Sequence, residues 1–292
     1  MILLKQNLTE AFAHMQKNNK NICILGGNDD LVNSFYSDCK SRFKKVVYIN
    51  FSDKRISRKL DNNIFNLKLY ELKKCLDILN KNSINKVVLL GKISRPDLSR
   101  FKLDGVIDKY LDKLISAYKK GDGEILNLVI NIFNENGFKA VPATSITSNF
   151  SFSKKNKDLL FSKNKFDQSD IAKSLKILDD LSKYDNAQSI VIDNGFILAI
   201  EAAEGTDEML DKVYRYKKRM NLLLKKSGIL VKLPKKNQSL KVDLPVIGPQ
   251  TISLLRKTGI NSIAVSKLHT IVNDLAMTIK EIKKNRINLY LI

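Results

Sequence analysis

Several residue types that commonly build catalytic sites are scarce in this 292-residue sequence. It has only two histidines, His14 and His269, which argues against a histidine-rich zinc site. Its three cysteines, Cys23, Cys39 and Cys75, show no C-x-x-C spacing. An odd number of such cysteines indicates free thiols in a reducing compartment. The motif G-x-x-x-x-G-K-[ST] does not occur, so a P-loop is not supported.

Long apolar runs are also lacking. None approaches the roughly 20 residues that a helix needs to span a bilayer. The first residues, MILLKQNLTEAFAHM, lack the basic region, apolar stretch and small-residue cleavage site of a secretory signal. We therefore expect a cytoplasmic protein. Its length and its apolar fraction of 43% suit two globular domains with sizeable cores.

Acidic residues are few relative to basic ones: 30 Asp and Glu against 51 Lys and Arg give a net charge of +21. Such an excess attracts nucleic acid, an anionic membrane surface or a phosphorylated ligand. Alternatively, lysine simply coats the whole surface. The densest basic stretches, SKKNKDLLFSKNK and LVKLPKKNQSLKV, lack the interleaved aromatic residues of a surface that binds single-stranded nucleic acid. We favour the general coat, with weak membrane attraction second.

The first half of the chain predicts an α/β fold. Three apolar segments, NICILGG, KVVYINF and INKVVLLGKI, have the pattern of buried strands. Helical patterns lie between them, and the clearest is IFNLKLYELKKCLDILNKN. This alternation predicts a Rossmann-like α/β domain with a parallel sheet over residues 1–146. Residues 147–165 are rich in Ser, Asn and Lys, which predicts a linker or long loop.

Residues 166–292 predict a second, smaller domain of mixed α/β structure. The segment QSIVIDNGFILAIEAAEG predicts two strands joined by a hairpin at Asn194 and Gly195. The following TDEMLDKVYRYKKRMNLLLKK predicts a long helix. The apolar side chains expected on one face of this helix are Met209, Val213, Tyr216, Met220 and Leu223.

Carboxylates gather where the hairpin ends, in the segment FILAIEAAEGTDEML. Thr206 is expected to cap the next helix, and Asp207 complements the positive end of its dipole. Glu201 and Glu204 have no such explanation. Glu201 ends the apolar face of an expected buried strand, where an ion costs several kcal/mol unless it is paired or binds metal. Mg²⁺, held by one or two carboxylates and phosphate oxygens, is one explanation, and a structural role is the other.

The segment KVDLPVIGPQT is a second candidate site. Asp243 is expected to leave a strand, Gly248 allows a turn, and Pro249 can occupy the first helical position. The free N–H groups at such a helix start form an anion site. An acid beside that turn favours phosphate chemistry. The alternative is a rigid strand-to-helix loop in which Asp243 is a turn residue.

Three features of the first half are less specific. Gly26-Gly27 after the first strand is half of a dinucleotide fingerprint, and Asp122 in GDGEIL has the position of a helix N-cap. Lys92 and Arg95, in GKISRPD, follow a strand at the edge where open α/β sheets place ligands. These two cations are candidates to hold a pyrophosphate.

Taken together, the motifs resemble one known family. They are, in order, GKISRPD, KKGDGEIL, ENGF, DNAQSIVIDNGFILAIEAAEGTDEML, GILVKLPK and VDLPVIGPQT. This set is spread over most of the chain and closely resembles the LpxI type of UDP-2,3-diacylglucosamine pyrophosphatase. The E-A-x-E-G-T-D block followed by V-D-L-P-x-I-G is the most specific part of the resemblance.

The resemblance implies an activity and a location. Such enzymes act in lipid A biosynthesis at the inner face of the cytoplasmic membrane of Gram-negative bacteria. They hydrolyse UDP-2,3-diacylglucosamine to UMP and 2,3-diacylglucosamine 1-phosphate (lipid X), with a divalent cation that is usually Mg²⁺. We therefore expect two α/β domains, peripheral attachment to the inner membrane and no nucleic-acid partner. Whether the protein forms a homodimer is not indicated by the sequence.

The resemblance also implies site residues. Asp243 corresponds to the family's essential aspartate, and we expect it to form one cation pocket with the acidic block. The catalytic candidates are Asp243, Glu204 and Asp207; the metal candidates are Asp243, Glu201, Glu204 and Asp122. The substrate-binding candidates are Lys92, Arg95, Gln188, Gly205, Thr206 and Gly248.

The sequence also departs from the family pattern. It has GGNDDLV where G-G-G-x-L-P is common, and Gly123 stands where a second acid is common. These departures put phosphate contacts at Gly26 and Gly27 and a paired-carboxylate role for Asp122 in doubt. The rival interpretation is a non-enzymatic α/β protein that binds nucleotide, lipid or nucleic acid. It leaves the two acidic segments unexplained.

Overall fold

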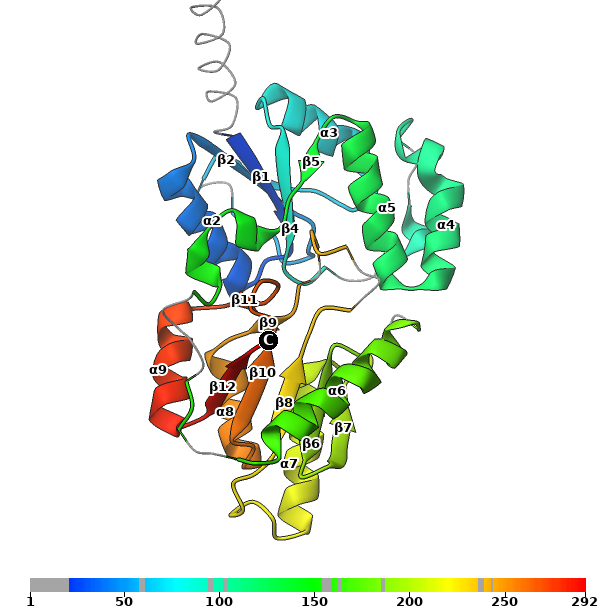
Figure 1. Cartoon of the computed structure of the whole chain (residues 1–292). Coiled ribbons are helices and arrows are strands. Elements are labelled where there is room, and N and C mark those ends of the chain that lie inside the picture. The colour runs from blue at the N-terminus through cyan, green and yellow to red at the C-terminus, as the bar shows by residue number, and fades with distance from the viewer. Residues whose placement is uncertain are drawn as a thin grey trace, which may run out of the picture. The chain divides into compact units, whose positions relative to one another are not determined.

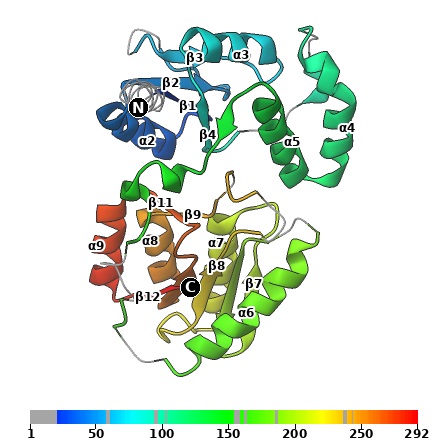
Figure 2. The same cartoon turned by 45° about the horizontal axis from the view of Figure 1, so that its top comes forward.

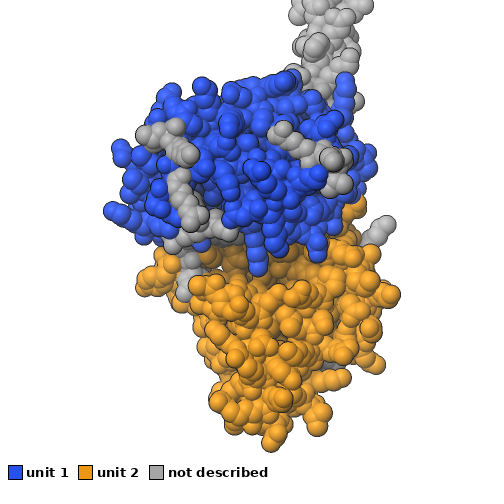
Figure 3. Space-filling model, turned by 180° about the vertical axis from the view of Figure 1, so that it is seen from behind, with its two compact units in different colours: residues 1–146 blue, residues 147–292 orange. Residues whose placement is uncertain are grey.

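The computed structural model describes residues 21–57, 61–93, 97–101, 104–153, 159–161, 164–184, 187–235, 239–242 and 244–292. The chain divides into two compact units, Met1–Ile146 and Thr147–Ile292, which are coloured separately in Figure 3. Each unit combines its own β-sheet with helices. The predicted fold class, two α/β domains, is thus confirmed.

The sheet of the first unit has five parallel strands in the order β3-β2-β1-β4-β5 (Figure 1). The strands are β1 (Asn21–Gly26), β2 (Lys45–Asn50), β3 (Ile64–Asn66), β4 (Lys86–Leu90) and β5 (Lys139–Ala140). The order reverses between β1 and β4, which is the Rossmann-like switch point where such sheets bind ligands. The predicted parallel sheet is therefore present.

The helices described in the first unit bury apolar side chains, among them Phe35 and Leu79. They are α2 (Asp30–Arg42), α3 (Leu72–Lys81), α4 (Leu111–Lys120) and α5 (Asp122–Glu135). In Figures 1 and 2, α4 and α5 lie side by side. The prediction of one helix across residues 64–82 is wrong at its start. Residues 64–66 form β3, because the backbone groups at the edge of β2 find their partners there.

The sheet of the second unit is mixed, in the order β12-β10-β8-β6-β7. Its strands are β6 (Ser189–Asp193), β7 (Phe196–Ile200), β8 (Ile229–Lys232), β10 (Ser262–Val265) and β12 (Asn288–Leu291). Strands β8, β10 and β12 are parallel, whereas β6 runs antiparallel to both β8 and β7. Asn194 and Gly195 have φ values of 50° and 85°, the left-handed conformation of a tight hairpin turn. The predicted hairpin is confirmed.

Helices cover both faces of this second sheet (Figure 1). They are α6 (Asp167–Ser182), α7 (Thr206–Arg219), α8 (Pro249–Thr258) and α9 (Leu275–Asn285). Neighbouring strand residues alternate between the two layers: Leu230 packs with the side chains of α7, α8 and α9, whereas Val231 packs with those of α6. The central strands are thus buried on both faces. A two-stranded sheet of β9 (Val246–Ile247) and β11 (Ile271–Val272) completes the unit.

The buried stripe of α7 differs from the predicted one. Met209 and Val213 are buried, but Met220 is 52% exposed. The stripe continues instead through Lys217, four residues after Val213, and the ammonium of Lys217 lies 3.5 Å from Asp193. A lysine occupies this core position because the hairpin supplies it with a carboxylate.

The strand that precedes the acidic block, β7, is an edge strand and not the buried strand expected from its sequence. Phe196 is 76% exposed, and Ile197 is exposed as well. The reason lies in the strand order, because β7 pairs only with β6. The apolar character of its sequence reflects contacts with both layers. Leu198 and Ala199 pack against the side chains of α7, α8 and α9, and Ile200 packs against those of α6.

The described part of residues 147–165, which we predicted as a linker or long loop, packs on the second unit. Phe150 and Phe152 are buried. The backbone N–H of Phe161 donates to Asn288, and the carbonyl of Leu159 accepts from Leu289 N at 2.9 Å. The second unit begins at Thr147 for this reason and is as long as the first.

Candidate functional site

The acidic block at residues 201–207 lies at one end of the second sheet. Because β6 runs antiparallel to its neighbours, its first residue lies at the same end as the last residues of β7 and β8. Ser189 pairs with Lys232 across the β6–β8 ladder, and the N–H of Glu201 donates to the carbonyl of Ser189 at 2.9 Å. Three neighbouring strands thus bring a hydroxyl, an ammonium and a carboxylate together.

Helix α7 begins directly beside these strand ends. Gly205 is its N-cap, with φ 83° and ψ 170°, and Thr206 is its first residue. The predicted capping role of Thr206 is therefore wrong. Its hydroxyl donates instead to Glu201 Oε2 at 3.0 Å, a hydrogen bond strengthened by the charge of the carboxylate.

Lys232 completes this group. It is only 7% exposed, and its Nζ donates to Thr206 Oγ1. The hydroxyl of Ser189 lies 3.4 Å from the same oxygen. We call Ser189, Glu201, Thr206 and Lys232 the Thr206 cluster.

Sequence reasoning named Glu201 and Thr206 but missed Lys232 and Ser189. A signal for Lys232 was present in GILVKLPK, where a charged residue ends an apolar strand. Glu201 follows its own apolar strand in the same way.

Glu204 has a different environment. Its carboxylate forms an ion pair with Lys212 of α7 at 2.7 Å. The hydrogen bond from Lys212 lowers the pKa of Glu204 and so favours its ionised form. A metal ion that bound the carboxylate of Glu204 would have to compete with Lys212.

The start of helix α8 lies next to the start of α7. Gln250 Nε2 donates to Asp207 Oδ2 at 3.3 Å and so links the first turns of the two helices. Pro249 is the first residue of α8, as predicted, and Gly248 before it has extended backbone. Two helix N-termini therefore adjoin, and helix N-termini attract anions.

Gln188 is the residue before Ser189, a member of the Thr206 cluster. Its carbonyl accepts from the N–H of Leu233 at 2.9 Å, which extends the β6–β8 pairing by one step. Asp243 and Arg95 lie outside the described residues. The strand expected before Asp243 is not formed: Lys241 and Val242 belong to a turn, and the strand β9 follows instead.

Asp122, a predicted metal ligand and N-cap, lies in the first unit. It is the first residue of α5, and the N-cap is Gly121, so the capping prediction is wrong. With Glu124 it places negative charge in the first turn, where the helix dipole favours it. This local role accounts for an acid at that position.

Packing explains the glycines at the switch point of the first sheet. A Cβ on Gly26 would lie 2.1 Å from the carbonyl oxygen of Leu90, and one on Gly27 would lie 2.0 Å from that of Lys92. The carboxylate of Asp29 caps α2 and also accepts from Lys92 N at 3.1 Å. An acid thus occupies the helix start where a dinucleotide fingerprint would bind phosphate, while the Lys92 side chain is exposed.

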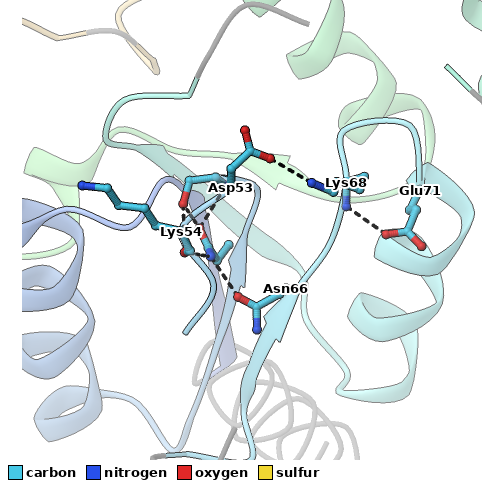
Figure 4. Close-up of polar contacts among 7 residues, drawn as sticks. Asp53, Lys54, Asn66, Lys68 and Glu71 are labelled. Carbon is cyan, nitrogen blue, oxygen red and sulfur yellow. Dashed lines mark hydrogen bonds and ion pairs between the residues drawn. The ribbon is translucent and has the colours of Figure 1, made fainter. Parts of the chain in front are cut away.

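The loops after β2 and β3 hold a further polar group (Figure 4). Buried Asn50 donates to Asn66 Oδ1 at 2.9 Å and to the carbonyl of Lys54 at 2.8 Å. Nearby, Lys68 pairs with Asp53, and the N–H of Lys68 donates to Glu71. These contacts hold the loops that follow the carboxyl ends of strands β2 and β3 in place.

Comparison with known proteins identifies the family. The LpxI N-terminal domain model matches residues 21–150, and the LpxI C-terminal domain model matches residues 159–290. The UDP-2,3-diacylglucosamine pyrophosphatase LpxI of Caulobacter vibrioides is 31% identical over 194 residues, which are 66% of this chain and 69% of that protein. The chain belongs to the LpxI family.

In this LpxI-family chain, the described residues contain no group of three or more His, Cys, Asp or Glu side chains that could hold a metal. Glu201 Oε1 and Asp207 Oδ1 make no hydrogen bond within the described part of the chain. Mg²⁺ takes only one or two protein carboxylates when phosphate oxygens complete its shell. Glu201 and Asp207 are carboxylates, the ligand type that such an ion uses, and both lie at this end of the sheet.

Proposed function

We propose that this chain is a UDP-2,3-diacylglucosamine pyrophosphatase of lipid A biosynthesis. It would hydrolyse its substrate to UMP and 2,3-diacylglucosamine 1-phosphate. The observation that carries the proposal is the match to both LpxI domains, together with a relative that bears this activity in its name. The arrangement of charged groups in the second unit supports it.

The second unit offers the groups that a diphosphate needs. Lys232 supplies a buried positive charge at the sheet end, and the adjoining starts of α7 and α8 carry N–H groups that favour anions. Phosphoryl transfer depends mainly on positioning and on stabilising charge. We assign the diphosphate to this end of the sheet for that reason.

We further propose that the reaction uses a divalent cation, Mg²⁺, held by Asp243 together with one of the two carboxylates Glu201 and Asp207. When bound, such an ion neutralises phosphate charge and lowers the pKa of a bound water. The carboxylates themselves hold and orient the attacking water. Because Lys212 already pairs with Glu204, that residue is the weaker ligand candidate.

Attachment to the membrane would be peripheral. Within the described residues, no helix has the length and apolar character needed to cross a bilayer. The net charge of +21 favours contact with anionic lipid headgroups. We propose that this attraction brings the protein to the inner face of the cytoplasmic membrane, where its lipid substrate lies.

The test is release of UMP from purified UDP-2,3-diacylglucosamine, with Mg²⁺ or with a chelator. We expect turnover by the unmodified chain, loss of turnover with chelator, and loss in Asp243→Ala. Asp180→Ala is the matched control, because Asp180 is an exposed helix residue paired only with a neighbouring lysine in the described chain. It should keep full activity.

The outcomes separate the parts of the proposal. No UMP from the unmodified chain would contradict the assigned reaction. Full activity with chelator would contradict the metal, and full activity of Asp243→Ala would contradict the role of that residue. Thermal unfolding of each variant shows whether a loss of activity reflects a loss of fold.

A further inference from the structure

The hydrogen bonds of the Thr206 cluster have a fixed direction. A lysine ammonium has three donors and no acceptor, whereas a hydroxyl has one donor and two acceptor sites. Thr206 Oγ1 must therefore accept from Lys232 Nζ. The single proton of Thr206 is left for Glu201 Oε2 at 3.0 Å, and the Ser189 hydroxyl at 3.4 Å can use the second acceptor site. The chain runs from Lys232 through Thr206 to Glu201.

The backbone holds the members of this chain in place. Ser189 and Thr206 are buried, as is Lys232. Lys232 and Ser189 are partners in one strand ladder, and Glu201 continues the next ladder through its N–H bond to Ser189. Removing a buried charge partner is costly, because the remaining charge is then uncompensated. The threonine hydroxyl links the buried ammonium to the carboxylate across this short span.

We propose that Lys232 and Thr206 are positioning residues for the reaction, acting through Glu201. Because Oε2 accepts the proton of Thr206, the carboxylate group of Glu201 is held in one orientation. Its other oxygen, Oε1, is then directed to a fixed place at the sheet end. This inference rests on the proposed function, since it assumes that Glu201 faces the reacting diphosphate.

A purely structural role makes a different prediction. If Thr206 and Lys232 only stabilised the fold, their replacement would lower stability, and any effect on turnover would be independent of Glu201. If they orient Glu201, their effect on kcat disappears once Glu201 can no longer act. The dependence on Glu201 distinguishes the two roles.

The experiment measures kcat and KM of UDP-2,3-diacylglucosamine hydrolysis in single and double variants. We expect Thr206→Val and Lys232→Met to lower kcat about 10- to 100-fold, the order expected for a misplaced catalytic group. Thr206→Ser, which keeps the hydroxyl, should recover most of the loss. In a Glu201→Gln background, Thr206→Val and Lys232→Met should have little further effect on kcat.

Thr258→Val is the matched control. Thr258 is also a buried threonine of the second unit, and its hydroxyl donates to the carbonyl of Leu255 at 2.7 Å. Its replacement should lower stability without changing kcat. Additive losses of kcat in the double variants, or equal losses in Thr206→Val and Thr206→Ser, would overturn the positioning role.

A stability measurement separates this inference from the proposed function. If the unmodified chain releases no UMP, the proposed function has failed, and the positioning role fails with it. The hydrogen-bonded chain can still be checked by urea unfolding of Lys232→Met, Thr206→Val and their double variant. Non-additive effects support the chain, because both residues share one hydrogen bond. Additive effects contradict the chain itself.

Discussion

Two buried lysines of the second unit lie close to carboxylates. Lys232 reaches Glu201 through one hydroxyl, and Lys217 reaches Asp193 directly. Burial lowers the pKa of Lys217, and the nearby Asp193 opposes this effect. Each of these lysines places a charge in apolar surroundings. The loss of a hydrogen-bond partner there should therefore lower the unfolding free energy by more than the loss of a partner at the surface.

Asp61 in the first unit illustrates how partners set the properties of a single residue. Burial by itself would raise its pKa. Hydrogen bonds from Lys40, from the N–H of Asn63 and from Tyr36 outweigh that effect and lower the pKa to about 2. A lowered carboxylate pKa stabilises the fold above the unfolded pKa, and this stabilisation is lost as the pH falls through the folded value.

We therefore predict that Asp61→Asn lowers the unfolding free energy at pH 7 by about 1–2 kcal/mol, reduced from the full linkage value because Lys40 is half exposed. The difference from the unmodified chain should shrink between about pH 4 and pH 2. Urea unfolding followed by circular dichroism at several pH values measures it.

Asp53→Asn is the control for this prediction. Asp53 pairs with Lys68 at 2.8 Å, but its side chain is 89% exposed, so the ion pair contributes little. A pH-independent difference for Asp61→Asn, or an equal effect of Asp53→Asn, would contradict the explanation.

At the scale of elements, two glycines precede the two helix starts of the candidate site, and they differ in backbone conformation. Gly205 has φ 83° and ψ 170°, a region that residues with a side chain almost never adopt. Gly248 has φ −165°, which is ordinary extended backbone. Its added Cβ would lie 3.3 Å from Asn273 Cβ, so that a small shift suffices.

We predict that Gly205→Ala lowers the unfolding free energy by about 1–3 kcal/mol, the usual cost of such a strained backbone. It should also lower turnover, because Thr206 follows directly. Gly248→Ala should have a smaller effect on stability, and Ala203→Ser, at an exposed position in the same turn, should have almost none. Thermal unfolding and UMP release measure both properties. A larger stability loss in Gly248→Ala than in Gly205→Ala would contradict the argument from backbone strain.

The charge of the whole molecule bears on its location. With 51 basic and 30 acidic residues, the chain should bind vesicles that contain anionic lipid and should bind neutral vesicles weakly. Salt screens exposed charges, so we expect binding to fall as salt rises. Cosedimentation with both kinds of vesicle at low and high salt measures this. Equal binding to neutral and anionic vesicles would contradict attraction by charge.

The sequence by itself determined those features that depend on neighbours along the chain. Apolar segments alternating with amphipathic ones predicted the two α/β units. Asn194 and Gly195 predicted a hairpin because few residues adopt its left-handed turn, and Pro249 predicted a helix start because its φ suits that position. The acidic block was visible for the same local reason, as charge at the end of an apolar strand.

Only the tertiary structure decided which side chains meet. Strand order placed β7 at an edge, gave β2 a partner where a helix was predicted, and set Lys232 beside a threonine 26 positions earlier in the chain. Glu204 and Thr206 stand two residues apart, yet one pairs with Lys212 and the other with Glu201 and Lys232. The physical reason is that hydrogen bonds between strands depend on their order and register, and spacing within one segment records neither.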